Sequence, residues 1–306
     1  MELVSAVICT RNRPTALERA VRSLLSNERP NIEVIVVDQS DGSETREILA
    51  TNLDPRLRYV RSSQRGKGKA LNEALRLARA EFVACTDDDC EVPADWVASM
   101  VRALEQQPTA AVVFCNVRTA PYDRSVGYVP NYECRGNRLL RSIGACRDGL
   151  GFGAGMMFRR DVVVELGGFD ESFGPGSRFA SGDDHELCHR LLLKGWHVYE
   201  TGDVSVVHHG FLTFQEGRSH TRRDWTSAGA AGAKLLRAGG LEGATVPLWL
   251  FLAYALWPPF FDLLRFRRPR QGARIIGFID GFISGWRTPL DRRTLIYGTA
   301  SSGSDR

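Results

Sequence analysis

Between residue 3 and about residue 118, short runs of apolar and β-branched residues alternate with longer stretches of helical periodicity. The runs are Leu3 to Cys9, Glu33 to Asp38, Leu57 to Arg61, Phe82 to Thr86 and Ala111 to Val117. Between the first two runs, Leu17, Val21 and Leu24 share one helical face, and Leu71 and Leu75 do so further on. This alternation predicts an α/β fold, in which helices cover both faces of a mostly parallel sheet as three α/β/α layers.

The pattern changes twice further along the chain. Residues 119–152 show no clean period and are rich in Tyr, Arg, Asn and Gly, which predicts a long functional loop. Order returns at Gly155 to Arg159, with a helix at Asp183 to Lys194 and a strand at Val204 to Val207. Because the composition shifts after about residue 215, we expect a catalytic domain over residues 1–215 and a helical extension over residues 216–306.

The extension contains two apolar stretches, Gly243 to Phe261 and Ile275 to Trp286. An arginine cluster lies between and beside them: Arg265, Arg267, Arg268, Arg270 and Arg274. Prolines interrupt the first stretch, so it suits the membrane interface better than a full crossing, and the arginines favour an anionic cytoplasmic leaflet. We therefore expect peripheral membrane contact through residues 243–286. The alternative is a helical hairpin buried against the catalytic domain.

Composition narrows the class of protein. The chain has 306 residues, 43% of them hydrophobic, which is enough for a full core. The net charge of +4 is too small for a dedicated nucleic-acid binder. The 7 cysteines include no C-x-x-C pair, and Glu2 stands where a signal peptide carries positive charge. We expect reduced thiols and a cytoplasmic location.

Polar residues follow the predicted strands at the edge where an open parallel sheet binds ligands. Thr10 to Arg13 follow the first strand, Asp38 ends the second, and Asp87, Asp88 and Asp89 follow the fourth. Three adjacent carboxylates repel one another unless a cation lies among them, and their hard oxygens suit Mg²⁺ or Mn²⁺. The alternative is a helix N-cap ahead of Pro93.

Two further groups could carry chemistry. Asp183 and Asp184 stand at the start of a helix, where the macrodipole keeps a carboxylate ionised and able to accept a proton, although they could also be caps. His208 and His209 end the last strand, and one of them could bind a metal.

Two glycine-rich motifs are weak signals. Lys67, in Gly66-Lys67-Gly68-Lys69 before a helix, could reach a phosphate, but the spacing is not that of a P-loop. Gly151, Gly153 and Gly155 lack the strand-turn-helix context of a dinucleotide site.

Over roughly residues 3–240 the sequence resembles bacterial family 2 glycosyltransferases of the GT-A fold. The matching stretches are Val4 to Arg13, Glu33 to Asp38, Lys69 to Asn72, Asp87 to Asp89, Gly167 to Glu171 and Asp183 to Leu191. In this order and spacing they are specific. The resemblance implies a metal-dependent, inverting transfer of a hexose from a nucleoside-diphosphate donor to an acceptor hydroxyl in cell-surface glycan or glycolipid synthesis.

The resemblance also implies roles for residues. Thr10, Arg11 and Asp38 contact the nucleoside in this comparison, and Asp38 is the partner of the base. The segment Asp87 to Asp89 resembles the DxD motif that binds metal and diphosphate, and we expect Arg13 and Lys67 to join the donor-binding residues.

The comparison further places the catalytic base at Asp184, with Asp183 where a glutamate is usual, and His208 where some relatives have a third metal ligand. Aromatic, basic C-terminal segments like this one occur in relatives that use lipid-linked acceptors.

Two rival functions remain. A sugar nucleotidyltransferase would need a glycine-rich first loop, and residues 10–14 contain no glycine. An inert, membrane-associated protein with the same fold would have little reason to keep carboxylate clusters at 87–89 and 183–184.

Overall fold

The structure, a computed structural model, describes the whole chain except residues 1, 30, 135, 268–271 and 299–306. Within the described residues, nine strands form one sheet in the order β3-β2-β1-β4-β9-β6-β10-β5, and β8 pairs with β10. These strands are β1 (Val4–Thr10), β2 (Ile32–Asp38), β3 (Leu57–Arg61), β4 (Phe82–Asp87), β5 (Cys90–Glu91), β6 (Ala110–Thr119), β8 (Arg138–Leu140), β9 (Met156–Arg159) and β10 (His197–His208). A separate pair joins β7 (Gly127–Tyr128) to β11 (Leu212–Thr213).

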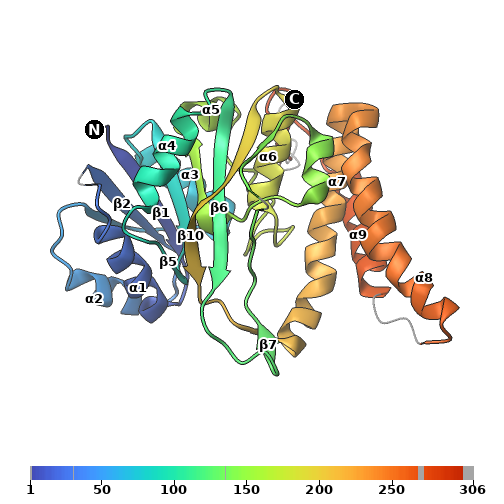
Figure 1. Cartoon of the computed structure of the whole chain (residues 1–306), viewed down its shortest axis with the longest axis horizontal. Coiled ribbons are helices and arrows are strands. Elements are labelled where there is room, and N and C mark those ends of the chain that lie inside the picture. The colour runs from blue at the N-terminus through green and yellow to red at the C-terminus, as the bar shows by residue number, and fades with distance from the viewer. Residues whose placement is uncertain (1, 30, 135, 268–271, 299–306) are drawn as a thin grey trace, which may run out of the picture.

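Helices cover both faces of the large sheet, and three more stand beside it (Figure 1). The helices are α1 (Pro14–Leu25), α2 (Glu44–Ala50), α3 (Lys67–Leu77), α4 (Trp96–Glu105), α5 (Arg160–Glu165), α6 (Asp183–Leu193), α7 (Phe214–Leu250), α8 (Trp257–Leu264) and α9 (Gly272–Arg287). Buried residues of α1, α2 and α4 form one core with the sheet, and those of α3, α5 and α6 form the other. This confirms the predicted three-layer α/β/α architecture.

The two cores follow from the alternation of side chains along each strand. In β1, Val4, Ala6 and Ile8 join the core under α1, whereas Val7 joins the core under α3. Because successive side chains of a strand point to opposite faces, a strand covered on both sides must be apolar at nearly every position. The five apolar runs that we identified in the sequence correspond to β1, β2, β3, β4 and β6 within one or two residues.

The second half of the chain departs from the predicted pattern. The strand β9 is antiparallel to both of its neighbours, β4 and β6. The segment that we predicted as a loop contains β7, β8 and a short helical turn, Ile143–Asp148. These short elements show no period of their own because they form only by pairing with distant strands, as β8 does with β10. The predicted last strand is also longer, beginning at His197.

Parallel register brings the ends of the central strands to one level. Thr10 pairs with Asp38 across β1 and β2, and Cys9 pairs with Asp87 across β1 and β4. The strand β10 ends at His208, which lies opposite Cys90 in the antiparallel β5. The polar residues that follow β1, β4 and β10 therefore meet at the carboxyl edge of the sheet.

The C-terminal helices stand beside the sheet, and α8 projects away from the body (Figure 1). The chain is helical from Phe214 to Leu264, with a π-helical segment at Phe251–Leu256 and non-helical backbone at Gly240. By length and composition this run could cross a membrane, and 22% of its most apolar 18-residue window is buried in the protein. Pro247, Pro258 and Pro259 therefore do not interrupt the helical run, contrary to our expectation from the sequence.

Glycines let α7 and α9 pack at close range. A Cβ at Gly229 would collide with the carbonyl of Phe278, and one at Gly281 would collide with that of Thr226. The inner faces thus form a packed helix pair, as in the buried-hairpin alternative, while the outer faces expose large apolar side chains. Of the arginine cluster, Arg268 and Arg270 lie outside the described residues.

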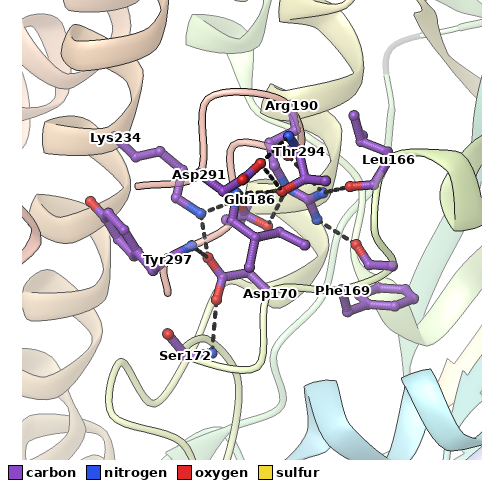
Figure 2. Close-up of polar contacts among 12 residues, drawn as sticks. Leu166, Phe169, Asp170, Ser172, Glu186, Arg190, Lys234, Asp291, Thr294 and Tyr297 are labelled. Carbon is purple, nitrogen blue, oxygen red and sulfur yellow. Dashed lines mark hydrogen bonds and ion pairs between the residues drawn. The ribbon is translucent and has the colours of Figure 1, made fainter. Parts of the chain in front are cut away.

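A buried ionic network attaches α7 to α6 and to the loop that carries Asp170 (Figure 2). The ammonium of Lys234 on α7 donates to Asp170 and, over 2.6 Å, to Glu186 on α6. Arg190, one turn further along α6, donates to the same Glu186 over 2.8 Å. The backbone N–H of Tyr297 reaches Asp170 over 2.8 Å. Burial alone would raise the pKa of Glu186, but Arg190 and Lys234 lower it, so this carboxylate is ionised inside the protein.

Candidate active site

A cavity of about 330 Å³ opens at the carboxyl edge of the sheet. It is lined by Cys9, Thr10, Arg11, Arg13, Gln39, Gly66, Lys67, Asp87, Asp88, Asp89, Pro175, Gly176 and His208. The structure thus brings together eight of the predicted site residues in one place. Because these residues come from six separate segments, the cavity exists only in the folded chain.

Each of the three aspartates pairs with a cationic side chain, and Asp88 and Asp89 share Arg13. Asp87 accepts a hydrogen bond from the ammonium of Lys67 over 2.6 Å. Asp88 accepts from the Thr10 hydroxyl over 2.7 Å and from Arg13 over 3.1 Å. Asp89 accepts from Arg13 over 2.8 Å, and the imidazole of His208 lies 3.3 Å away. None of the three caps a helix, since α4 starts at Trp96 and its cap position is Asp95, so the N-cap alternative does not apply.

The charges of the cluster shift one another. Burial raises the pKa of Asp88, and Arg13 opposes that rise only in part. Burial would also raise the pKa of Asp89, but His208 and Arg13 lower it. Burial alone would lower the pKa of Lys67, but the carboxylates of Asp87 and Asp183 raise it well above its usual value. At neutral pH the cavity therefore holds cations and carboxylates at close range, as an anionic ligand with a bound metal would require.

The donor set fits a divalent cation of the hard or intermediate kind. His208 Nδ1 lies 2.8 Å from the carbonyl oxygen of Pro130 and must donate to it, so Nε2 faces Asp89. Carboxylate oxygens with one imidazole nitrogen suit Mn²⁺, and oxygens alone suit Mg²⁺. Cys90 also lies close to Asp89 and His208. Burial raises the pKa of its thiol, so it is the weakest donor of the three.

Of the predicted nucleoside contacts, Thr10 and Arg11 line the cavity and Asp38 does not. Arg11 lines the cavity and pairs with Asp41 over 3.3 Å. Asp38 is fully buried and is not among the lining residues; it accepts hydrogen bonds from Tyr59 over 2.8 Å and Arg61 over 2.9 Å. Its neighbour Gln39 lines the cavity instead.

A second cavity, of about 580 Å³, shares Lys67 and Pro175 with the first. Asp183 and Asp184 line it from the first turn of α6. Asp184 accepts hydrogen bonds from the backbone N–H groups of Gly153 and His185, over 2.7 and 2.8 Å. The cap position is Gly182, with φ of 77°, and no side chain caps the helix, so neither aspartate acts as an N-cap.

The environment treats the two carboxylates differently. Burial raises the pKa of Asp183, and Lys67 counteracts it. Burial would also raise the pKa of Asp184, but His185, Lys67 and two backbone amides lower it. Asp184 is therefore an ionised carboxylate facing a cavity, which is what a proton acceptor requires.

Sequence reasoning missed the contribution of α7 to the second cavity. His220, Arg223, Ser227, Leu235 and Val246 line it from that helix. No local signal could have identified them, because their role depends on how α7 docks. Cys90 was also missed, although it directly follows the aspartate run.

Comparisons with known proteins identify the family and the fold of the chain. The model of the family described as "Glycosyl transferase family 2" matches residues 5–167, more than half of the chain. The chain is 24% identical over 218 residues to glucosyl-dolichyl phosphate glucuronosyltransferase of Haloferax volcanii. That match covers 67% of this chain and 66% of the relative, just under two thirds of its length.

Two solved structures have a similar fold. The mannosyltransferase PcManGT of Pyrobaculum calidifontis, in complex with GDP-Man and Mn²⁺, has a TM-score of 0.61 at 22% identity and covers 93% of this chain and 87% of its own. TarS 1-349 of S. aureus, in complex with UDP-GlcNAc, has a TM-score of 0.64 at 16% identity over 92% and 81%. With a family model matched over more than half its length and with this fold, the chain belongs to glycosyl transferase family 2.

Proposed function

We propose that the chain transfers a sugar from a nucleoside-diphosphate donor to an acceptor hydroxyl, with a divalent cation, Mg²⁺ or Mn²⁺, at Asp87, Asp89 and His208. The observation that carries the proposal is the pair of adjoining cavities that share Lys67. One contains three carboxylates with three cationic side chains, those of Arg11, Arg13 and Lys67, and the other contains the aspartate pair of α6.

In the first cavity the side chains suit a diphosphate and its nucleoside. Lys67 and Arg13 are cations that face the same space and can donate to phosphate oxygens. Thr10 and Arg11 lie where β1 ends and can contact the nucleoside, while Asp88 holds Thr10 and Arg13 in place. Asp38 remains our predicted partner of the base. Its carboxylate accepts a hydrogen bond from the backbone N–H of Ser40 over 2.8 Å, which stabilises the loop after β2. A cation at this site would neutralise charge on the departing diphosphate.

In the second cavity Asp184 would remove the proton from the acceptor hydroxyl as that oxygen attacks the anomeric carbon. The base and the diphosphate site lie in separate cavities, with Lys67 between them, which supports attack from the face opposite the leaving group and hence inversion. The backbone donors of Gly153 and His185 fix the orientation of the carboxylate. Asp183 would contribute indirectly: its carboxylate helps to raise the pKa of Lys67 and so to keep that ammonium charged.

Thermal-shift screening of UDP-, GDP- and dTDP-sugars tests the donor site. A donor at 100 times its dissociation constant should stabilise the folded state by roughly 2.7 kcal/mol, which raises the melting temperature by several degrees. We expect one nucleoside series to produce this shift only with Mn²⁺ or Mg²⁺ present, and to release nucleoside diphosphate on incubation. The absence of both a shift and any release with every donor would favour the inert, membrane-associated alternative.

The lining of the second cavity favours a lipid-linked acceptor. The second cavity has an apolar wall from α7, including Leu235, Val246 and Leu250. It adjoins a third cavity, of about 990 Å³, which shares Val246 and Leu250 and extends to Trp249 and Tyr254 on the helical run. One relative is named as acting on a dolichyl phosphate, and another as acting on a diphosphoundecaprenol. An apolar chain lying along this path would place its head group near Asp184.

The outer face of the C-terminal helices suits the membrane that holds such a lipid. Exposed apolar side chains gather on it: Leu252, Trp257, Phe260, Phe261, Leu263, Leu264, Ile276, Ile279, Ile283 and Trp286. Arg265 and Arg267 follow α8 directly, and Arg274 lies near the start of α9. Aromatic and aliphatic side chains next to arginines are typical of a surface that enters an anionic interface. We propose a peripheral position on the cytoplasmic face of the cell membrane.

Changing two exposed aromatic residues of α8 should weaken membrane binding. Trp257→Ser with Phe260→Ser removes side chains that are 57% and 48% exposed. Each buried aromatic contributes about 1.5–3 kcal/mol, so partition to vesicles containing phosphatidylglycerol should fall by about tenfold or more in sedimentation assays. The control is Leu53→Ser, which changes a 91% exposed leucine between α2 and β3. Equal partition of the double variant and the wild type would rule out this face.

A further inference from the structure

The start of α6 carries the aspartate pair but no capping side chain of its own. Two contacts from α7 hold it instead. The backbone N–H of Ser181, just before the helix, donates to the hydroxyl of Ser227 over 3.2 Å. Glu186, one turn after Asp183, accepts from Lys234 over 2.6 Å. Ser227 and Lys234 are seven residues apart, so they lie on the same face of α7 two turns from each other.

The side chain of Lys234 is buried among other described residues. Its side chain is 3% exposed, and its two carboxylate partners, Asp170 and Glu186, are 0% and 1% exposed. The ammonium also lies 4.4 Å from the ring centroid of Tyr297 and 5.0 Å from that of Phe173. A buried, fully paired charge has few alternative arrangements, because leaving either partner uncompensated is costly. The contact therefore fixes the distance between α6 and α7 better than apolar packing would.

The position of α7 depends in turn on α9. At Gly229 and Gly281 the absence of a side chain lets the two helices pack at close range. Arg237, one turn after Lys234 on α7, donates to the carbonyls of Gly285 and Thr288 at the end of α9, over 3.1 and 2.7 Å. A chain of contacts thus runs from α9 through α7 to the first turns of α6.

We propose that Lys234 is a positioning residue for Asp183 and Asp184, acting through Glu186 to hold the first turns of α6 against α7. Its significance for turnover rests on the proposed function, whereas its effect on α6 does not. The C-terminal helices are then part of the catalytic architecture, in addition to any contact that they make with a membrane.

The test compares Lys234→Met with Arg237→Met in the full chain. Both variants remove a cation from the same helix, but the hydrogen bonds of Arg237 go to α9 and not to α6, and the close packing of α7 on α9 at Gly229 and Gly281 remains without them. Hydrogen–deuterium exchange of a peptide covering residues 183–193 should be at least tenfold faster in Lys234→Met and within twofold of wild type in Arg237→Met. Turnover of the donor found by screening should fall about 100-fold in Lys234→Met, as expected when a reacting group is misplaced, while the donor dissociation constant changes less than twofold.

Equal exchange of α6 in Lys234→Met and wild type would overturn the proposal, as would a fall in turnover matched by an equal loss of donor binding. If Lys234→Met does not fold, Ser227→Ala removes only the second tie and should change exchange and turnover in the same direction by about threefold; no change in either measurement would also overturn it. If the wild type turns over no donor, the proposed function fails, but the exchange comparison still decides whether Lys234 positions α6.

Discussion

Asp184→Asn should reduce sugar transfer by about 10²–10⁴-fold while leaving donor binding intact, because it removes the proton acceptor and little else. The carboxylate accepts from two backbone N–H groups, those of Gly153 and His185. An asparagine can accept only one of these bonds with its single oxygen, so a modest loss of stability should accompany the loss of transfer. Transfer is measured by steady-state release of nucleoside diphosphate, and donor affinity is measured by calorimetry.

A matched control separates the chemistry from the substitution itself. Asp161→Asn makes the same change at a side chain that is 85% exposed and that, within the described residues, forms an ion pair only with its neighbour Arg160. It should leave both transfer and donor affinity unchanged. If Asp184→Asn transfers within tenfold of wild type and Asp183→Asn does not, Asp183 is the base and the roles of the pair are exchanged.

His208→Gln should reduce transfer by about 10³-fold, and should abolish the tightening of donor binding by Mn²⁺. The imidazole Nε2 faces Asp89, and glutamine offers a weaker, neutral oxygen in a different position. Binding of the donor without metal should change little, since Lys67 and Arg13 remain. Calorimetric titration of Mn²⁺ in the presence of donor measures the effect directly.

The neighbouring residue offers the control for this experiment. His209→Gln alters a histidine that pairs with Glu91 over 2.7 Å and does not line the first cavity. The His209→Gln variant should bind Mn²⁺ in the presence of donor with the same affinity as the wild type. Chelation by EDTA should stop wild-type transfer, and added Mn²⁺ should restore it. Full transfer in EDTA would remove the metal from the proposal, and an unchanged Mn²⁺ titration in His208→Gln would remove that residue alone.

Much of the first cavity could be predicted from sequence for a physical reason. The strands β1, β2 and β4 are recognisable as continuous apolar runs, and parallel register then places their ends at one edge. Thr10, Arg13 and the run Asp87 to Asp89 follow those ends directly. Their proximity therefore depends only on local pattern and on the geometry that all parallel sheets share.

The remaining features required contacts that no local pattern encodes. The sequence suggested a metal role for His208, but its closeness to Asp89 depends on antiparallel pairing of the two-residue β5 with β10. Asp38 ends a strand like the other residues, yet it is fully buried, accepts hydrogen bonds from Tyr59 and Arg61 of the neighbouring β3, and does not line the cavity.

The sequence by itself determined the strands β1, β2, β3, β4 and β6, the helices α1, α3 and α6, and the carboxyl edge at which polar residues gather, because local hydrophobic periodicity specifies these elements and their buried faces. The tertiary structure alone decided that β9 inserts antiparallel between β4 and β6, and that α7 forms the wall of the second cavity. It also decided that Lys234 lies against Glu186, 48 residues away in sequence. Such contacts depend on which packed surfaces fit together at long range, and a single lysine in a helical pattern carries no sign of its partner.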